Sequence, residues 1–139
     1  MNAPLYTTEI LRLAASLSDP RELEHEDGRA ELRSPTCGSR ITTTVKLDDQ
    51  GRVRDLAQQV HACAFGQASA ALLEKSAAGR SREEVTLTLT DISAWLDGSE
   101  AEPGWGLAAL APARSRKSRH GAILLPFRAL ASAMERAGG

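Results

Sequence analysis

The chain has 139 residues, a length typical of one domain, and 42% of them are hydrophobic, which is enough for one core. Its 17 basic and 18 acidic side chains leave a formal net charge of −1, which excludes a general binder of nucleic acid or of anionic membranes. No apolar run approaches the ~20 residues of a membrane span. The first ten residues lack the basic and apolar segments of a secretory signal. We therefore expect a single domain over residues 1–139, located in the cytoplasm.

The first half of the chain predicts one helix followed by three strands. Apolar residues from Leu5 to Leu17 recur at helical spacing, with Thr7 or Thr8 as the cap. The pattern then alternates with a period of two, which indicates half-buried strands. These strands are expected over Ala30–Ser34, Ile41–Leu47 and Val53–Val60, with a turn at Asp48–Gly51 and a bulge near Ala57. Short turns favour an antiparallel meander.

The second half of the chain predicts helices. One spans Ala64–Ala78 and ends at Gly79, and a capping box at Ser81–Glu84 opens the next, which runs to about Leu96. A basic loop is expected over Pro112–Arg119, followed by an amphipathic helix over Ile123–Met134 with Pro126 in its first turn. The predicted fold class is α+β, a three-stranded antiparallel sheet with helices packed on one face.

The two cysteines are the strongest candidates for chemistry. Two are too few for a disulfide framework, and a lone cysteine is often a small buried hydrophobe. Cys37 follows Pro35 and precedes Gly38, which predicts a tight loop between two strands. Cys63 lies where the third strand ends and a helix begins, and a helix N-terminus favours the thiolate form. If the strands that carry these junctions pair, the two sulfur atoms converge at one end of the sheet.

These segments resemble the NifU/IscU-type iron–sulfur cluster assembly scaffold family. The resemblance rests on Pro35-Thr36-Cys37-Gly38, on the turn with Asp49-Gln50-Gly51 and on the run from Ala62 to Ala70. It extends over most of the chain, from Leu5 to Ala133, and includes Leu125–Leu130. The family implies an α+β fold, a site of three cysteines and one aspartate that binds zinc or a nascent cluster, and a cysteine desulfurase as sulfur donor.

The chain departs from the family pattern at three positions. Ser39 stands where the family aspartate is expected, Ser34 replaces the asparagine before the proline, and Ala122 occupies the place of the third cysteine. His120 lies two residues before Ala122 and is a candidate replacement ligand. His61 lies two residues before Cys63, so the two would share a face if the strand persisted. Cys37, Cys63, His120 and His61 are thus the candidate ligands for iron, an iron–sulfur cluster or zinc.

Other features carry weaker predictions. The basic run Arg114, Arg116, Lys117 and Arg119 is a solvated loop or a contact for an acidic partner, such as the desulfurase or a cluster-recipient protein. Trp95 and Trp105 are expected to fill gaps in the core or anchor loops. Ser69 lacks the context of a hydrolase nucleophile, and no phosphate-binding loop is present.

We therefore expect a carrier rather than an enzyme, with Cys37 and Cys63 as its reactive thiols. Three hypotheses remain open: a scaffold that receives sulfur and iron, a zinc-dependent persulfide acceptor, and a non-catalytic interaction module that keeps the fold.

Overall fold

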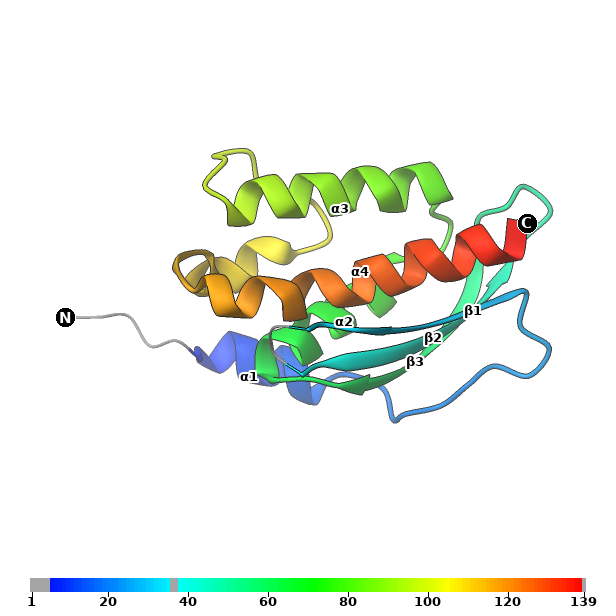
Figure 1. The fold of residues 1–139 in the computed structure, drawn as a ribbon, viewed down its shortest axis with the longest axis horizontal. Helices are drawn as coiled ribbons and strands as arrows, with labels where there is room; N and C mark the ends of the chain where they lie inside the picture. The colour runs from blue at the N-terminus through cyan, green and yellow to red at the C-terminus, as the bar shows by residue number, and fades with distance from the viewer. Residues whose placement is uncertain (1–5, 36–37, 139) are drawn as a thin grey trace.

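A computed structural model describes residues 6–35 and 38–138 (Figure 1). Helix α1 (Thr8–Ala15) is followed by strands β1 (Gly28–Arg33), β2 (Arg40–Leu47) and β3 (Val53–His61). Helices α2 (Ala64–Ser76) and α3 (Arg82–Leu96), the 3₁₀ helix η1 (Leu107–Ser115) and helix α4 (Lys117–Gly138) complete the order.

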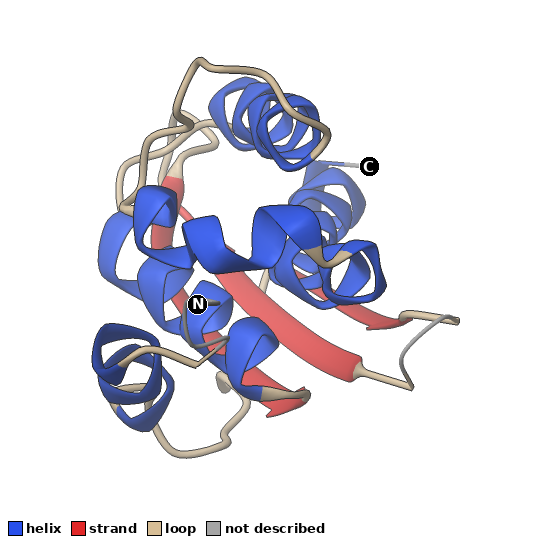
Figure 2. Ribbon diagram, turned by 90° about the vertical axis from the view of Figure 1, so that its left-hand side faces the viewer, coloured by secondary structure: helices blue, strands red, loops and turns tan. Residues whose placement is uncertain are grey.

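The three strands form one antiparallel sheet in the order β1-β2-β3. At one end, Arg33 pairs with Arg40, and Arg40 pairs with His61. Inward-facing residues alternate with outward-facing ones, because successive side chains of a strand point to opposite faces. The helices gather on the inner side of this sheet (Figure 2). The predicted α+β class, with a three-stranded antiparallel sheet and helices on one face, is confirmed.

The β-bulge lies closer to the β2–β3 turn than the sequence predicts. The register shifts between Lys46 and Leu47, opposite the first residues of β3, and the pairing is regular at Ala57. The position near Ala57 was therefore wrong. Val53 and Leu56 are both buried although they are three residues apart, which a regular strand cannot achieve. That spacing requires a bulge at the start of the strand.

The β2–β3 turn closes through its own hydrogen bonds, and we call this side of the sheet the turn end. The backbone N–H of Asp48 donates to the carbonyl oxygen of Arg52 at 2.8 Å, and Gly51 adopts a φ of 77°. The carboxylate of Asp48 accepts from the backbone N–H groups of Arg52 and Gln50, each at 2.9 Å. These hydrogen bonds hold the pKa of Asp48 below its ordinary value.

The predicted capping box at the start of α3 is present beside this turn. Ser81 Oγ accepts from the N–H of Glu84 at 3.1 Å, and the N–H of Ser81 donates to Glu84 at 3.2 Å. Arg80 and Arg52 also lie against the Glu84 carboxylate, at 3.3 and 3.5 Å. The Ser81 N–H and then Arg80 lower the pKa of Glu84.

Helix α4 lies across β1 and β2, with α2 beside it, and α1 packs on α2 while α3 packs on α4. Its close approach to β1 and α2 depends on two glycines. A Cβ atom at Gly28 would collide with the carbonyl oxygen of Ala133. A Cβ atom at Gly66 would lie 2.6 Å from the Cβ of Ala62 and 3.3 Å from the carbonyl oxygen of Ala122. Side chains larger than hydrogen would therefore push α4 away from its neighbours.

Helix α4 begins earlier than the sequence predicts. The segment expected as a basic loop, Pro112–Arg119, is divided between η1 and the first turn of α4. Pro126 is consequently the tenth residue of the helix and not part of its first turn. Lysine and arginine are good helix formers, which the loop interpretation ignored. Pro126 is also buried, so packing offsets the hydrogen bond that its missing N–H cannot make.

Candidate functional site

Three segments that are distant in the sequence meet at the end of the sheet opposite the turn. We call this the thiol end, and define it by the pairs Arg33–Arg40 and Arg40–His61 together with the start of α2 at Cys63. The β1–β2 connection and the β3–α2 junction both lie there, and α4 begins beside them (Figure 1). The predicted convergence of these junctions is thus a property of the topology.

Cys63 occupies the N-cap position of α2, as the sequence predicts. Its backbone is extended, with φ −67° and ψ 174°, and its carbonyl oxygen accepts from the N–H of Gln67 at 2.9 Å. Its side chain makes no capping hydrogen bond, although serine or aspartate at such a position usually does. The thiol is free, half-buried and packed against the main core. Its sulfur is therefore not used to stabilise the helix.

The connection that carries the other cysteine is tight where it is described. Cys37 itself lies outside the described residues. The N–H of Ser34 donates to the carbonyl oxygen of Ser39 at 2.8 Å, and the N–H of Gly38 donates to that of Ser34 at 3.2 Å. Gly38 has a φ of 71°, a conformation that glycine adopts without strain. Ser34 and Ser39, two of the three departures from the family pattern, are both buried.

Ala122 lies against the first turn of α2. A Cβ atom at Gly66 would be 3.4 Å from the Cβ of Ala122, and Gly66 is three residues after Cys63. The position assigned to the missing third cysteine is therefore at the thiol end, where a buried methyl group stands. That methyl group offers no ligand.

His120 is anchored to the backbone before α4. Its Nε2 lies 3.1 Å from the carbonyl oxygens of both Ala113 and Arg114. Because carbonyl oxygens only accept, Nε2 is the donor in these contacts, and Nδ1 is the ring nitrogen left for another partner. A metal would therefore bind His120 through Nδ1.

His61 lies in different surroundings from Cys63. It is exposed on the outer face of the sheet, where it lines a shallow cavity of about 180 Å³ with Arg40, Thr42 and Gln59 among others. The strand ends at His61, so the condition for a face shared with Cys63 is not met. Among residues 6–35 and 38–138, no group of three or more His, Cys, Asp and Glu side chains is placed to hold a metal.

Sequence reasoning missed a buried serine that joins two helices. Ser69 on α2 is fully buried and donates to the carbonyl oxygen of Ile123 on α4 at 2.6 Å. This bond lies just before Pro126, whose missing N–H leaves the neighbouring carbonyl of Ala122 without its helical donor. Gly66 and Ser69 are small residues three apart on one helix, a pattern that indicates close packing of α2 on another helix.

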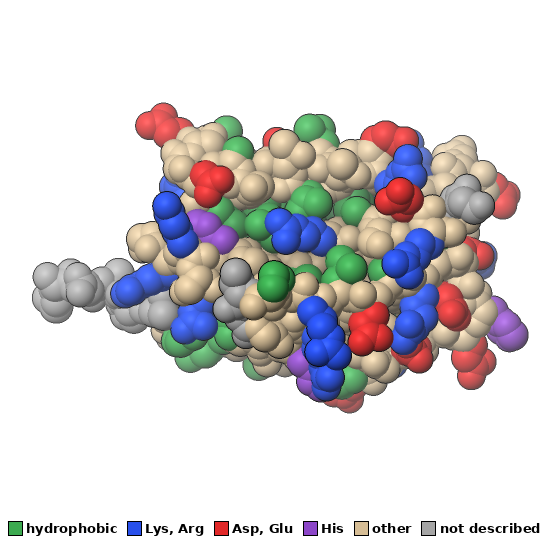
Figure 3. Space-filling model, viewed as in Figure 1, with side chains coloured by type: hydrophobic (Ala, Val, Ile, Leu, Met, Phe, Trp, Pro, Cys, Tyr) green, Lys and Arg blue, Asp and Glu red, His purple; other side chains and the backbone are tan. Residues whose placement is uncertain are grey.

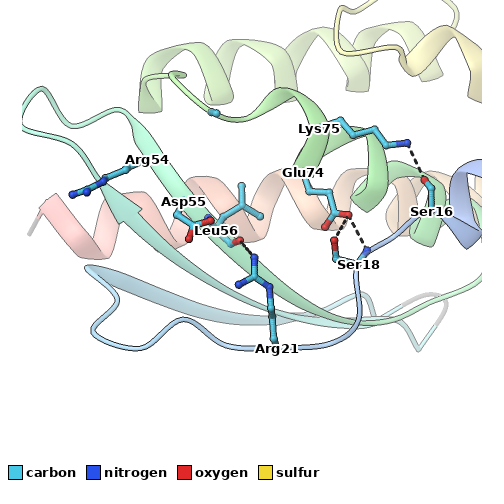
Figure 4. Close-up of a pocket in the computed structure, with 9 residues that line it drawn as sticks. Ser16, Ser18, Arg21, Arg54, Asp55, Leu56, Glu74 and Lys75 are labelled. Atoms are coloured by element: carbon cyan, nitrogen blue, oxygen red, sulfur yellow. Dashed lines mark hydrogen bonds between the residues drawn. The ribbon is translucent and has the colours of Figure 1, made fainter.

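A second feature missed by the sequence is a pocket of about 390 Å³ between β3, α2 and the segment after α1 (Figure 4). Its polar groups are largely bonded to one another. Glu74 accepts from the N–H and Oγ of Ser18 at 2.8 and 3.0 Å, Lys75 donates to Ser16 at 2.9 Å, and Arg21 donates to the Leu56 carbonyl oxygen at 3.4 Å. The side chains that line the pocket therefore join the segment after α1 to α2 and β3, which is a structural role.

Both tryptophans serve the packing roles predicted for them. Trp95 is buried, and the Arg114 guanidinium lies 5.0 Å from its ring. Trp105 meets Phe127 edge-on at 5.2 Å.

The family model described as the NifU-like N-terminal domain matches residues 5–113. The chain belongs to this family. The match includes Cys37 and Cys63 and ends before His120 and Ala122. Both cysteines therefore lie in the NifU-like part of the sequence.

Individual relatives agree with this assignment. An iron–sulfur cluster assembly scaffold protein IscU from Streptococcus pyogenes serotype M1 is 32% identical over 93 residues, 62% of this chain. The match spans 57% of that relative's length. A nitrogen-fixing NifU-like protein (N-terminal) from Brucella abortus has a TM-score of 0.89 and 30% identity over 96% of this chain and 94% of its own.

A scaffold protein for the SUF system from Fervidobacterium islandicum shares the fold alone, with a TM-score of 0.83 at 19% identity over 94% of this chain and 96% of its own. In the described part of this NifU-like chain, no helix combines the length and hydropathy needed to cross a membrane.

Proposed function

We propose that this chain is a cytoplasmic carrier in iron–sulfur cluster assembly, in which Cys63 accepts sulfur from a cysteine desulfurase. The observation that carries the proposal is the placement of Cys63. Its thiol lies at a helix N-cap without a capping role, at the end of the sheet where β1 ends, β2 begins and β3 is followed by α2. A partly exposed thiol at a helix N-terminus that makes no capping hydrogen bond is available for chemistry.

The sulfur-transfer step needs no group beyond the two proteins. The Cys63 thiolate attacks the terminal sulfur of a persulfide on the donor, and the sulfur–sulfur bond of the donor breaks. The donor cysteine leaves as a thiolate, and Cys63 becomes the persulfide. One sulfane sulfur moves, and no net oxidation or reduction occurs.

Iron or a nascent cluster is the cargo of this site and not a permanent part of it. Cys63 and the Nδ1 atom of His120 are the described groups that offer ligands on the helical side, and Cys37 completes the pair of thiols. Ser39 and Ala122 replace an aspartate and a cysteine of the family pattern, so two negative charges are missing. We expect this reduced set to hold a ferric cluster less firmly than the family site, which favours transfer over storage.

A resident zinc ion is the second candidate. Zinc usually takes four ligands from Cys, His and carboxylate groups. The described residues bring Cys63 and one imidazole nitrogen of His120 to this region, and His61 faces the outer side of the sheet. With fewer than four ligands among the described residues, we rank a zinc centre second to sulfur acceptance.

The test is sulfur transfer measured by mass. The protein, purified in reducing and anaerobic conditions, is incubated with a cysteine desulfurase and cysteine, and its intact mass is recorded. We expect one added sulfur in the wild type and in Cys37→Ala, and none in Cys63→Ala. Metal analysis of the same three samples distinguishes a zinc centre from sulfur acceptance alone. A zinc centre requires about one zinc ion per chain in the wild type and its loss in Cys63→Ala.

Two outcomes would contradict the proposal. If no sulfur is added to the wild type, and neither substitution changes metal content or stability, the chain is an interaction module that keeps the fold. If Cys37→Ala abolishes transfer while Cys63→Ala does not, Cys37 is the acceptor instead.

A further inference from the structure

The charged side chains on the outer face of the sheet lie in cross-strand rows that differ in how their charge is balanced. Near the turn end, Lys46 pairs with Asp55 across two strands. In the middle, Arg29 lies 3.1 Å from Glu22 and 3.9 Å from Glu31. In these rows each basic side chain has an acidic neighbour, so the positive charge is balanced within the fold.

The row at the thiol end does not. Arg33 is the direct partner of Arg40, and Arg40 is the direct partner of His61. All three side chains are exposed, and within residues 6–35 and 38–138 none of them has an ion-pair partner within 4.0 Å. Like charges directly opposite each other on neighbouring strands destabilise a sheet. The pair of Arg33 and Arg40 therefore adds no stability to the sheet, and Glu31, which lines the same cavity as Arg40 and His61, lies 3.9 Å from Arg29.

A second group of cations stands at the same end, where α4 begins. Arg116 precedes the helix, Lys117 and Arg119 lie in its first turn, and that turn contains no acidic residue. The N-terminus of a helix is its positive end and favours acidic side chains. Figure 3 shows basic side chains on this side of the molecule, at its left, as well as others across the rest of the face. Arg114 is not part of this group, because it donates to the carbonyl oxygens of Trp95 and Ser99 at 2.9 and 2.7 Å.

Both groups border the thiol segments. Arg33 and Arg40 end and begin the strands on either side of the connection that carries Cys37, and His61 is two residues before Cys63. Ala122, which contacts the first turn of α2, belongs to the second turn of α4. We call these side chains the basic rim: Arg33, Arg40, His61, Arg116, Lys117 and Arg119.

We propose that the basic rim is a docking surface for an acidic protein surface, that of the sulfur donor. This inference rests on the proposed function. Unbalanced positive charge that costs stability at two separate elements, both beside the same thiol, is complemented by carboxylates of a partner. Neighbouring strands are about 4.8 Å apart, so the row on the sheet spans about 10 Å, a length that a short acidic helix or strand matches.

The composition argues against a nucleic acid as the occupant. The whole chain has a formal net charge of −1, and the rim contains no aromatic side chain on which a base would stack. Trp95 is buried and Trp105 is engaged with Phe127, so neither is available there.

The test compares two charge reversals of equal size. Arg33→Glu/Arg40→Glu inverts two cations of the rim and replaces one like-charged pair with another, so its stability should stay close to wild type. Arg82→Glu/Arg128→Glu makes the same change in net charge at exposed positions on α3 and α4. A third variant, Arg33→Lys/Arg40→Lys, keeps the charge.

The readout is the initial rate of sulfur transfer from a cysteine desulfurase, measured against the concentration of this protein at low and high salt. For Arg33→Glu/Arg40→Glu we expect the half-saturating concentration to rise on the order of tenfold at low salt, with an unchanged plateau rate. We also expect its dependence on salt to flatten. The control reversal and the lysine variant should both behave as the wild type.

Direct binding to the same desulfurase, measured by calorimetry, keeps the two proposals separate. If the wild type binds but transfers no sulfur, and the rim reversal abolishes binding, the docking surface stands and the proposed function fails. If the rim reversal transfers and binds as well as the wild type, the docking surface is overturned. If the wild type neither binds nor transfers, both are overturned. Tighter binding of a single-stranded oligonucleotide than of the desulfurase, lost in the rim reversal, would also overturn the assignment to a protein partner.

Discussion

The turn end and the thiol end of the same three strands treat charge in opposite ways. At the turn end, the carboxylates of Asp48 and Glu84 receive hydrogen bonds from the backbone and, at Glu84, from arginines. At the thiol end, Arg33 is the cross-strand partner of Arg40, and no described carboxylate lies within 4.0 Å of either guanidinium group. The comparison separates an end whose charges are balanced within the fold from an end whose charges are not, and it is for the unbalanced end that we propose a partner outside the chain.

The largest expected effect tests how closely the fold is packed toward the turn end. Gly28→Ala places a methyl group on the Ala133 carbonyl oxygen, so β1 and α4 must separate. We expect the free energy of unfolding to fall by about 3 kcal/mol, measured by urea denaturation.

Gly104→Ala is the matched control, because a Cβ atom there meets nothing within 4 Å. If Gly28→Ala lowers the free energy of unfolding by no more than Gly104→Ala does, the backbones of α4 and β1 are not in direct contact at Gly28.

A smaller effect, of opposite sign, is expected at the thiol end. Arg33→Glu replaces a like-charged cross-strand pair with an ion pair to Arg40. We expect a gain of about 0.5 kcal/mol at low salt, measured by the same method, together with weaker docking of the sulfur donor. A substitution that stabilises the fold and weakens binding would show that the charge is retained for a partner.

Arg33→Gln separates the two contributions, because it removes the repulsion without adding an attraction. Its stability should lie between those of the wild type and Arg33→Glu. A loss of stability in Arg33→Glu relative to Arg33→Gln would contradict the account of this row.

The smallest effect concerns the pH dependence of the turn end. The pKa of Asp48 is lowered in the folded protein, first by the Arg52 N–H and then by that of Gln50. The stability that its charged form adds is therefore present above the unfolded pKa of about 4 and is lost as the pH falls through the folded pKa. Asp48→Asn should be less stable than wild type near neutral pH, and the difference should close below about pH 4.

The measurement is the urea midpoint of both proteins across this range. Asp49→Asn is the control, because Asp49 accepts no hydrogen bond of this kind in the described chain. A difference between Asp48→Asn and wild type that stays constant with pH would contradict the role given to the charge.

Much of the fold follows from local pattern. Alternating β-branched residues in β2, the turn glycine at Gly51 and the capping box at Ser81 each specify their element without help from the rest of the chain. The predicted start of α4 was wrong because the helix propensity of its basic residues was ignored, and the predicted place of Pro126 was wrong because it depends on tertiary packing. A proline inside a helix is tolerated where its neighbours bury it, and no local pattern shows that.

The site was predictable to the same extent. A helix that starts at Ala64 places Cys63 at an N-cap, so its position followed from the sequence. The surroundings of His61 did not, since they depend on the residue at which β3 ends. The anchoring of His120 by two backbone carbonyls depends on the last residues of the 3₁₀ helix before α4, in the segment Pro112–Arg119 that was expected to be a loop.

The charged pattern of β1 also bears on how copies of this protein behave when they are concentrated. The edge of β3 is occupied in part by Arg21, whose N–H donates to Gln58, and by Arg80, whose carbonyl oxygen accepts from Val53. The outer edge of β1 carries the alternating charges of Arg29, Glu31 and Arg33. Charged side chains along an exposed strand oppose pairing with a strand of another molecule. Arg33, to which we assign a role in docking, therefore also opposes pairing of β1 with a strand of another molecule.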